Sequence, residues 1–212
     1  MEREGKRMEI KTFKDMYIAE LQELASVVRQ IGECLPHVAQ AASHPALKRI
    51  ILDNRHDTAL QKERLELILQ LHGAEVEAHT DQAMQAMVYE TNKMLPMLKG
   101  DDLRDAGLIA SIQRLKHYEI GAYGTAAALA GQLELRDDQD VLLESLEEEK
   151  LTDVELTALA EREVNPDAVT AYRACAPGAP SRRGNRRSIA RLIGGQRFAS
   201  ATAGSIRAST IR

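Results

Sequence analysis

The sequence has little of what builds a β-sheet or a disulfide framework. It contains no Trp, and its two Phe and five Tyr make up only 3% of the 212 residues. Sheets are enriched in aromatic and β-branched residues, whereas the abundant Ala, Leu, Glu and Gln of this chain favour helices. The two cysteines, Cys34 and Cys175, are too few for a disulfide framework or a cysteine zinc site. Cys34 falls in a helical stretch, where we expect a buried thiol.

Long apolar runs and several active-site motifs are also missing. No run approaches the roughly 18 apolar residues of a membrane span, and the first residues, MEREGKRMEIK, lack the apolar stretch of a signal peptide. We therefore expect a soluble, cytoplasmic protein without a membrane partner. The chain has no Walker-type or dinucleotide-binding glycine loop, no nucleophile elbow and no His-Glu-x-x-His zinc helix. The sequence thus identifies no catalytic residue and leaves open whether the protein is an enzyme.

The formal net charge of −4 is the sum of two unlike segments. Residues 1–165 contain 19 Lys and Arg against 31 Asp and Glu, whereas residues 166–212 contain nine Arg and one acid, Asp167. The second segment is dominated by Ala, Gly, Ser, Pro and Arg without a sustained apolar period, which is typical of disorder. We therefore predict a flexible N-terminus at 1–9, a folded domain at 10–165 and a basic, disordered tail at 166–212, with the boundary at Pro166.

The tail has three possible roles that the sequence does not separate. Its cluster of Arg182, Arg183, Arg186 and Arg187 could contact nucleic acid or anionic lipid through phosphate groups. It could also fold back on the acidic body. The interpretation that we favour is a solvated tail with no dedicated partner.

The wide spacing of helix-breaking residues within 10–165 predicts long helices. Gly73, the Lys99–Gly100 pair and the 136–138 cluster separate helical stretches, and Pro45 suits a first turn. We expect Pro36 to kink the first helix and Pro96 to end the short one. The predicted helices cover about 10–42, 45–72, 80–98, 102–132 and 138–163. No strand pattern competes, so the sequence predicts an all-α, antiparallel four-helix bundle with a short additional helix between the second and third helices.

Polar residues interrupt the apolar face of each predicted helix near its middle. Carboxylates occupy this face in four helices, and the remaining one, 45–72, has a polar patch. The interrupting residues are Glu20, the patch Asn54, Asp57 and Gln61, then Glu90, Glu119 and Glu149. A single carboxylate of this kind could lie at a bundle end or turn out to water. Several together predict a polar centre that needs a compensating cation, because burying an unpaired carboxylate costs several kcal/mol.

Five stretches of the body resemble a known family, the bacterial YciE/YciF-like stress proteins of the ferritin-like superfamily. The order and spacing match across about 10–165, and HYEIGAYGT and LEEEKLTD are the most specific parts. The resembling stretches are DMYIAELQELA (15–25), LPHVAQAASHPALKR (35–49), DTALQKERLELIL (57–69), DAGLIASIQRLKHYEIGAYGTAAALA (105–130) and LLESLEEEKLTDVELTALA (142–160). The resemblance implies a ferritin-like four-helix bundle, usually a homodimer, related to rubrerythrin and descended from a protein with a di-metal carboxylate centre.

The resemblance also implies a set of metal ligands, for which carboxylates favour iron or manganese. Glu20, Asp57 and Glu119 fall at three ligand positions, and Glu149 or its neighbour Glu148 falls at the fourth. Glu90, from the short helix, is a further candidate. Tyr123, four residues after Glu119, could donate a hydrogen bond to this cluster or be an ordinary packed tyrosine.

The chain departs from the family pattern at the ligand positions themselves. The family usually reads Glu-His-Tyr-Glu where this chain has Lys116-His117-Tyr118-Glu119, and it more usually has Glu at Asp57. The Glu-x-x-His pairs of rubrerythrin-type sites are missing. His56 and His117 are less favoured candidates for ligands. The Lys116 ammonium could reach the carboxylates and repel a second metal ion, or it could extend outward past the helix edge.

Two main functions therefore remain open at this point. The one that we favour from the sequence is a metal-binding, ferritin-like stress protein that holds one or two ions of iron or manganese, with a carboxylate site that has partly lost the family pattern. The other is a non-enzymatic helical stress or structural protein that has kept the fold and lost the metal. Association with nucleic acid through the arginine-rich tail is a third hypothesis.

Overall fold

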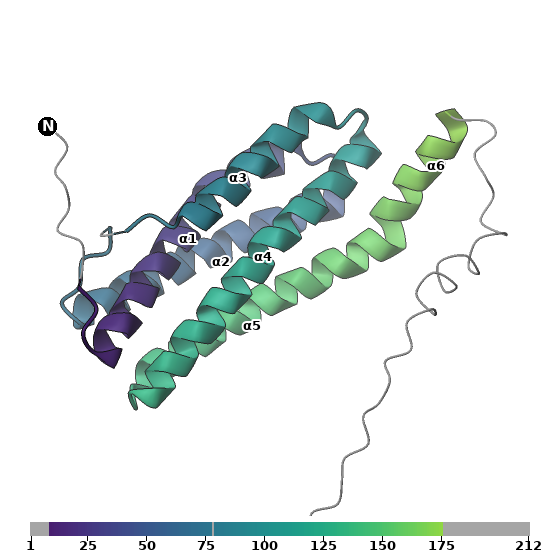
Figure 1. The fold of residues 1–212 in the computed structure, drawn as a ribbon. Helices are drawn as coiled ribbons and strands as arrows, with labels where there is room; N and C mark the ends of the chain where they lie inside the picture. Colours follow the sequence, from purple (N-terminus) through teal and green to yellow (C-terminus); the bar gives the residue numbers. More distant parts are fainter. Residues whose placement is uncertain (1–8, 78, 176–212) are drawn as a thin grey trace, which may run out of the picture. The chain divides into compact units, whose positions relative to one another are not determined.

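The computed structural model describes residues 9–77 and 79–175. It contains the long helices α1 (Phe13–Ala41), α2 (Pro45–Leu71), α4 (Asp101–Gln132) and α5 (Arg136–Leu159), with the shorter α3 (Gln82–Met94) between α2 and α4 (Figure 1). The described residues include no strand, so the predicted all-α fold is confirmed, and the predicted helix ranges lie close to the observed ones. None of the helices in this part of the chain is both long and apolar enough to cross a bilayer.

Local side-chain chemistry explains where the helices begin. Thr12 and Asp15 form a capping box at the start of α1: the Asp15 N–H donates to the Thr12 side chain, and the Thr12 N–H donates to the Asp15 carboxylate at 2.8 Å. Pro45 opens α2 in the first turn, where its missing N–H leaves no partner unsatisfied. The Asp81 carboxylate accepts a hydrogen bond from the Met84 N–H and caps α3.

Pro36 and Pro96 lie at different positions relative to the helix ends, and the kink expected at Pro36 in the interior of α1 stays a prediction. Helix α1 continues through Pro36 to Ala41. Helix α3 ends at Met94, and the 3₁₀ turn Leu95–Met97 that follows contains Pro96, as predicted. Gly100 then adopts a positive φ of 89°, a conformation that is strained for other residues, and leads into α4.

The side-chain contacts fix the direction of each helix. Helix α5 runs antiparallel to α2, since Gln61 contacts Glu149 while His72 contacts Asp138. It also runs antiparallel to α4, since Lys116 contacts Glu149 while Gln113 contacts Thr157. Helices α2 and α4 are therefore parallel, and their connection must cross the length of the bundle. Helix α3 lies in this crossover and packs on α1 and α4, which gives the ferritin-like arrangement with one long crossover (Figure 1).

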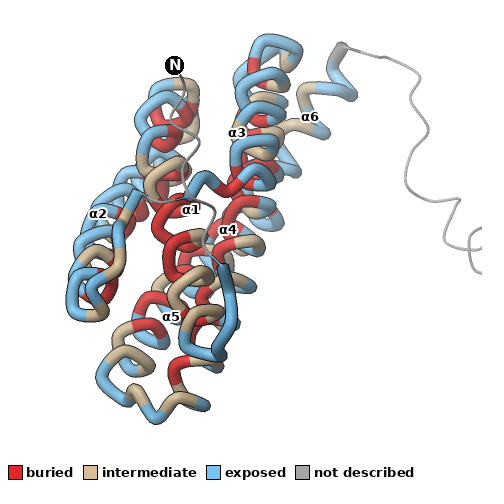
Figure 2. Tube along the Cα trace, turned by 60° about the vertical axis from the view of Figure 1, so that its left-hand side comes forward, coloured by how far each residue is buried: buried red, intermediate tan, exposed pale blue. Residues whose placement is uncertain are grey.

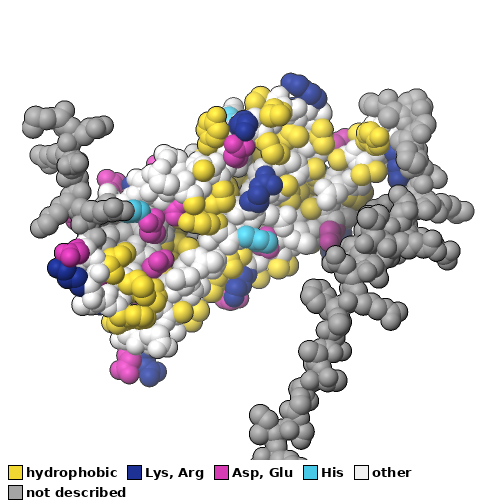
Figure 3. Space-filling model, in the orientation of Figure 1, with side chains coloured by type: hydrophobic (Ala, Val, Ile, Leu, Met, Phe, Trp, Pro, Cys, Tyr) yellow, Lys and Arg dark blue, Asp and Glu magenta, His cyan; other side chains and the backbone are white. Residues whose placement is uncertain are grey.

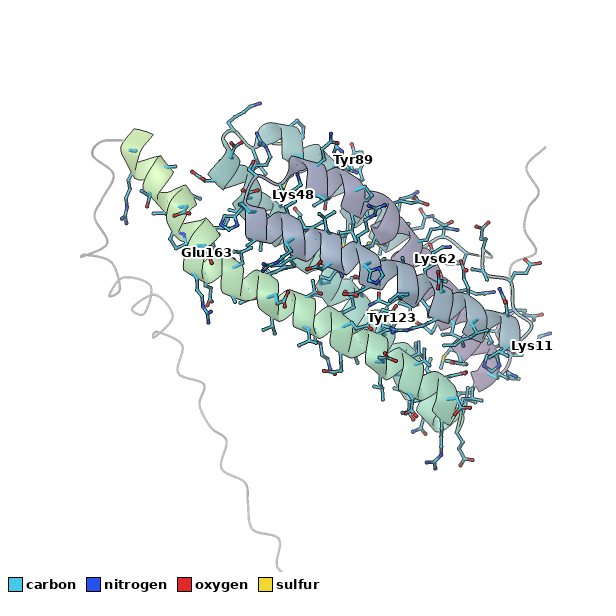
Figure 4. The ribbon with its side chains drawn as sticks, turned by 180° about the vertical axis from the view of Figure 1, so that it is seen from behind. Lys11, Lys48, Lys62, Tyr89, Tyr123 and Glu163 are labelled. Carbon is cyan, nitrogen blue, oxygen red and sulfur yellow. The ribbon has the colours of Figure 1, made fainter. Side chains whose placement is uncertain are left out.

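Helical structure continues beyond the predicted end of the bundle. A π-helical turn, Ala160–Val164, follows α5 and leads into α6 (Asn165–Cys175). Residues 166–175 of the predicted disordered tail are therefore helical, which contradicts the prediction for this part of the chain. Pro166 does not stop the helix because it lies in the first turn of α6, where proline is tolerated. Glu163 of the π turn, labelled in Figure 4, lies 3.5 Å from the His44 ring.

Some of the predicted segments cannot be compared with the structure. Residues 1–8 of the predicted flexible N-terminus lie outside the described residues. The same holds for 176–212 of the predicted tail, which includes Arg182, Arg183, Arg186 and Arg187.

The hydrophobic core consists of two clusters that a polar layer separates along the bundle. Figure 2 shows buried residues along the inward faces of the long helices. One cluster includes Leu47, Leu108 and Leu159, and the other includes Leu65, Ala126 and Leu142. On α2, α4 and α5 the residues between these clusters are buried and polar: Asn54, Thr58, Gln61, Lys116, Glu119, Glu149 and Thr152. We call this set the polar layer. Apolar side chains that reach the surface are scattered among charged ones on the face seen in Figure 3.

Candidate functional site

The centre of the polar layer is a lysine between two glutamates. The Lys116 Nζ lies 2.5 Å from Oε2 of Glu119, one turn further along α4, and 2.5 Å from Oε2 of Glu149 on α5. All three side chains have 0% exposure. Helical spacing explains the first contact, because residues three apart share a helix face. Of the two orientations considered for Lys116, the structure shows the inward one.

Helix α2 continues this network toward the surface. The side-chain amide of Gln61 donates hydrogen bonds of 2.9 Å to Glu149 and to Glu148. The Arg64 guanidinium, one turn along α2, donates to both oxygens of Glu148 at 2.9 Å and to Glu144 at 3.0 Å. The buried lysine and carboxylates are thus linked through Gln61 to a second, partly exposed ion pair.

Tyr123 closes the network on the side of the second hydrophobic cluster. Its side chain is fully buried, and its hydroxyl group lies 3.5 Å from the Gln61 side-chain oxygen. Figure 4 labels Tyr123 about halfway along the bundle, between the ribbons of α2 and α5. Burial raises the pKa of Tyr123 well above its usual value, and the charges of Glu119 and Glu149 raise it further. Tyr123 therefore stays protonated beside the carboxylates.

The charges of the cluster are balanced within it. Burial and the neighbouring carboxylate of Glu149 raise the pKa of Glu119 to about 8, against the opposing effect of Lys116. Burial alone would lower the pKa of Lys116, but the carboxylates of Glu119 and Glu149 outweigh it, so the pKa rises and the ammonium stays charged. At neutral pH Lys116 therefore carries its positive charge, and Glu119 is mostly protonated.

The structure brings some of the predicted ligand residues together. Glu119 and Glu149 share Lys116, and Glu148 adjoins them through Gln61. Asp57 is half-buried nearby, and its pKa is raised by burial and by the charges of Glu148 and Glu149. These four carboxylates therefore lie around one part of the bundle.

The other predicted residues lie elsewhere. Glu20 is half-buried on the side of Tyr118, where its charge contributes to the raised pKa of that tyrosine. Glu90 is exposed and pairs with Lys93 at 2.9 Å, so the expectation that it faces the core is wrong. The two less favoured ligand candidates, His117 and His56, are both exposed, and His117 contacts Asp153 at 3.0 Å.

The donor set around Lys116 does not fit the two-metal centre that the resemblance implies. An ammonium group lies where both inward carboxylates converge, and α2 presents the donor amide of Gln61 to Glu149 in place of a further carboxylate. Within residues 9–77 and 79–175, no three His, Cys, Asp or Glu side chains are grouped so that they could hold a metal ion. Binding of iron or manganese by Glu20, Asp57, Glu90, Glu119, Glu148 or Glu149 stays a prediction.

Arg64 is a residue of this ion-pair network that the sequence analysis does not predict. Gln61 and Arg64 lie three residues apart on α2, and Glu144 and Glu148 lie four apart on α5. Such spacings place each pair on one helix face. A search for complementary pairs between antiparallel helices would have found this signal.

A surface pocket lies apart from the polar layer, between α1 and α3. It has a volume of about 360 Å³ and is lined by Gln30, Glu33, Cys34, His37, Val88 and Asn92. Cys34 is buried, as expected, and burial raises the pKa of its thiol. The thiol is therefore in its less reactive, protonated form at neutral pH.

Comparisons with known proteins agree with this fold. Residues 12–169 match the family described as Domain of unknown function (DUF892). The chain is 35% identical over 162 residues to Protein YciF of Escherichia coli K12, covering 76% of this chain and 98% of that protein. The crystal structure of YciF, described as an E. coli stress protein, superimposes with a TM-score of 0.70 and covers 74% of this chain and 99% of that one.

A second solved structure is similar at lower identity. YcfI from Rhodopseudomonas palustris, described as a proposed structural protein, is 26% identical, with a TM-score of 0.68 and coverage of 71% of this chain and 96% of that one. The family match spans most of this chain, and the identity to YciF extends over nearly the whole of that protein. The chain therefore belongs to the DUF892 family, of which YciF is a similar member.

Proposed function

We propose that this chain is a non-enzymatic, structural helical protein of the stress response, in which a lysine takes the place of a metal centre. The observation that supports this most directly is the contact of one buried ammonium group with the inward carboxylates of both α4 and α5. The description of YciF as a stress protein and of YcfI as a proposed structural protein support it further.

Electrostatics supports the absence of redox chemistry at this centre. Two buried carboxylates attract a cation strongly, and Lys116 already supplies one at hydrogen-bonding distance. A divalent ion beside the ammonium would be repelled, because like charges a few Å apart interact strongly where water is excluded. The positive charge of Lys116 therefore disfavours a pair of metal ions at this centre.

Metal binding by the wild-type chain provides the test. The purified full-length protein would be analysed for metal content and titrated anaerobically with Fe²⁺ and with Mn²⁺, and its consumption of oxygen and of peroxide would then be followed. We expect only traces of metal and no oxidation of Fe²⁺ above that in protein-free buffer. Tight, stoichiometric binding of either ion by the folded wild-type chain would overturn the proposal in favour of the metal-binding alternative.

The proposal includes the predicted homodimer, because a structural role fits a protein that associates with its own copies. Light scattering coupled to size-exclusion chromatography measures this directly. A mass of one chain across the micromolar range would remove the dimer from the proposal without affecting the assignment of Lys116.

A further inference from the structure

We infer that Lys116 is the one residue that keeps divalent cations out of the polar layer, and that the carboxylates around it form a latent site for a single hard cation. This inference rests on the proposed function, since it explains how the wild-type centre stays free of metal. It goes further in naming the residue responsible and the class of ion that its removal would admit.

Glu119 is the possible cation ligand that most clearly lacks a partner other than Lys116. Its side chain has 0% exposure, and apart from the ion pair with Lys116 neither of its carboxylate oxygens has a hydrogen-bond partner among the described residues. Glu149 differs, because its Oε1 accepts a hydrogen bond from Gln61 while its Oε2 contacts Lys116. Without the ammonium, both oxygens of Glu119 and one of Glu149 would be left unpaired in the core.

These free oxygens match the preference of hard cations. Carboxylate oxygens bind Mg²⁺, Mn²⁺ and Ca²⁺ in preference to softer ions. The Lys116 nitrogen lies 2.5 Å from an oxygen of each glutamate. Oxygen ligands lie about 2.0–2.1 Å from Mg²⁺ and about 2.3–2.6 Å from Ca²⁺. A cation at the position of the nitrogen would therefore need only small movements of the two carboxylates.

The surrounding charges limit the latent site to one ion. Arg64 is occupied by Glu148 and Glu144, so it does not neutralise Glu119. Glu20 and Glu90 lie outside this cluster, Glu20 beside Tyr118 and Glu90 paired with Lys93. The two inward carboxylates together balance one divalent ion, and the chain offers no second buried pair beside them in the part that the structure describes.

The experiment replaces the ammonium group and keeps the length of the side chain. Lys116→Met removes the charge, and Lys116→Arg keeps a charge at the same position. Lys150→Met is a matched control on α5, where the exposed Lys150 pairs with Glu147. Each full-length variant and the wild type would be titrated with Mn²⁺ by calorimetry, and thermal unfolding would be followed with and without the ion.

We expect only Lys116→Met to bind about one Mn²⁺ per chain and to gain thermal stability with Mn²⁺ concentration. Adding Glu149→Gln to it should weaken binding at least tenfold, about 1.4 kcal/mol. A folded Lys116→Met variant that binds no Mn²⁺ would overturn this inference and leave the proposed function intact. Binding by the wild type would instead overturn the proposed function.

The experiment also tests the inference if Lys116→Met does not fold. Lys116→Gln, with a shorter neutral side chain, would be tested in parallel, and both variants would be refolded in the presence of Mn²⁺. An ion that enters the latent site supplies the missing positive charge, so it should restore helical circular dichroism. If both variants stay unfolded with Mn²⁺ present, the inference is wrong.

Discussion

The hydroxyl group of Tyr17 donates a hydrogen bond of 2.9 Å to Asp138, which lies 121 residues further along the chain. The same carboxylate oxygen of Asp138 lies 2.7 Å from the His72 ring nitrogen, and the Tyr17 and His72 rings meet edge to face with centroids 5.8 Å apart. This contact joins α1, the end of α2 and the start of α5 at one end of the bundle. Burial raises the pKa of Tyr17, and the hydrogen bond to Asp138 raises it further, so the hydroxyl group keeps its proton and remains a donor.

Removal of this hydroxyl group should loosen that end of the bundle. Tyr17→Phe keeps the buried ring and loses a hydrogen bond to a charged acceptor, which is worth about 1.5–3 kcal/mol. We expect the free energy of unfolding in urea to fall by that amount. Tyr89→Phe, at an exposed position of α3, should change it little. Equal effects of the two substitutions would show that the Tyr17 contact contributes nothing specific.

The raised pKa of Glu119 in the polar layer predicts a pH dependence of stability. Because the pKa of Glu119 is about 8 in the folded chain and near 4.5 when exposed, the folded state holds an extra proton between these values. The free energy of unfolding should therefore fall as the pH rises from about 4.5 to about 8, with a slope of up to about 1.4 kcal/mol per pH unit for one proton. Above pH 8 this contribution should level off.

The variant Glu119→Gln isolates this contribution. Its neutral amide cannot take up the proton, so the fall in stability between pH 5 and pH 8 should be smaller than in the wild type. Glu134→Gln, at an exposed carboxylate between α4 and α5, serves as the control. Parallel stability profiles of the wild type and Glu119→Gln would mean that Glu119 is ionised throughout this range.

Gln61 should be more important for stability than its lack of charge suggests. Gln61→Leu fits the buried site but leaves Glu149 and Glu148 without an amide donor. Each unsatisfied buried group costs about 1–3 kcal/mol, so the free energy of unfolding should fall by at least that much. Gln70→Leu, the same substitution at an exposed position of α2, should have a small effect. A Gln61→Leu variant as stable as the wild type would contradict the network.

Asp105 should hold the α1–α2 loop against α4. Its buried carboxylate accepts hydrogen bonds from the backbone N–H groups of Ser43 at 2.9 Å and His44 at 2.8 Å. Asp105→Ala leaves both donors unsatisfied at the start of α2 and should cost about 1–3 kcal/mol in urea unfolding. Asp105→Asn, with one acceptor oxygen, should cost less, and exposed Asp102→Ala little. Hydrogen exchange at Ser43 and His44 should speed up only in the Asp105 variants.

The sequence predicts the helices and the inward carboxylates of α4 and α5 well. Glu119 and Glu149 interrupt apolar faces at helical spacing, and both are fully buried in the structure. The reach of Lys116 to Glu119 follows from a spacing of three residues. Its contact with Glu149 depends on the alignment of α4 with α5, which the pattern along a single helix does not determine.

The wrong prediction for Glu90 has a specific cause. Helix α3 has two candidate apolar faces, and the structure buries Met84 and Thr91 while leaving Met87 half-buried. Glu90 therefore points to solvent beside the buried face. A helix that covers only one side of a bundle uses a narrow contact face, and periodicity alone does not distinguish it from the neighbouring one.

The continuation of helical structure to Cys175 is not predicted from the sequence, for a different reason. Composition changes near Pro166, but the backbone continues through a π turn in which Ala160 and Val164 are buried. Ala160 and Val164 belong to the hydrophobic core, so packing on the bundle keeps the π turn helical, and such packing is not visible in local composition.

The polar layer also fixes the alignment of the helices. Apolar side chains such as Leu and Ala can repack after a helix slides by one turn, because methyl groups have no fixed partners. Lys116 has no such freedom, since a shift of α4 along α5 by one turn, about 5.4 Å, would leave its ammonium and Glu149 buried and separated. The polar layer between the two apolar clusters therefore favours one alignment of α4 with α5. Bundles with these helices misaligned are disfavoured during folding.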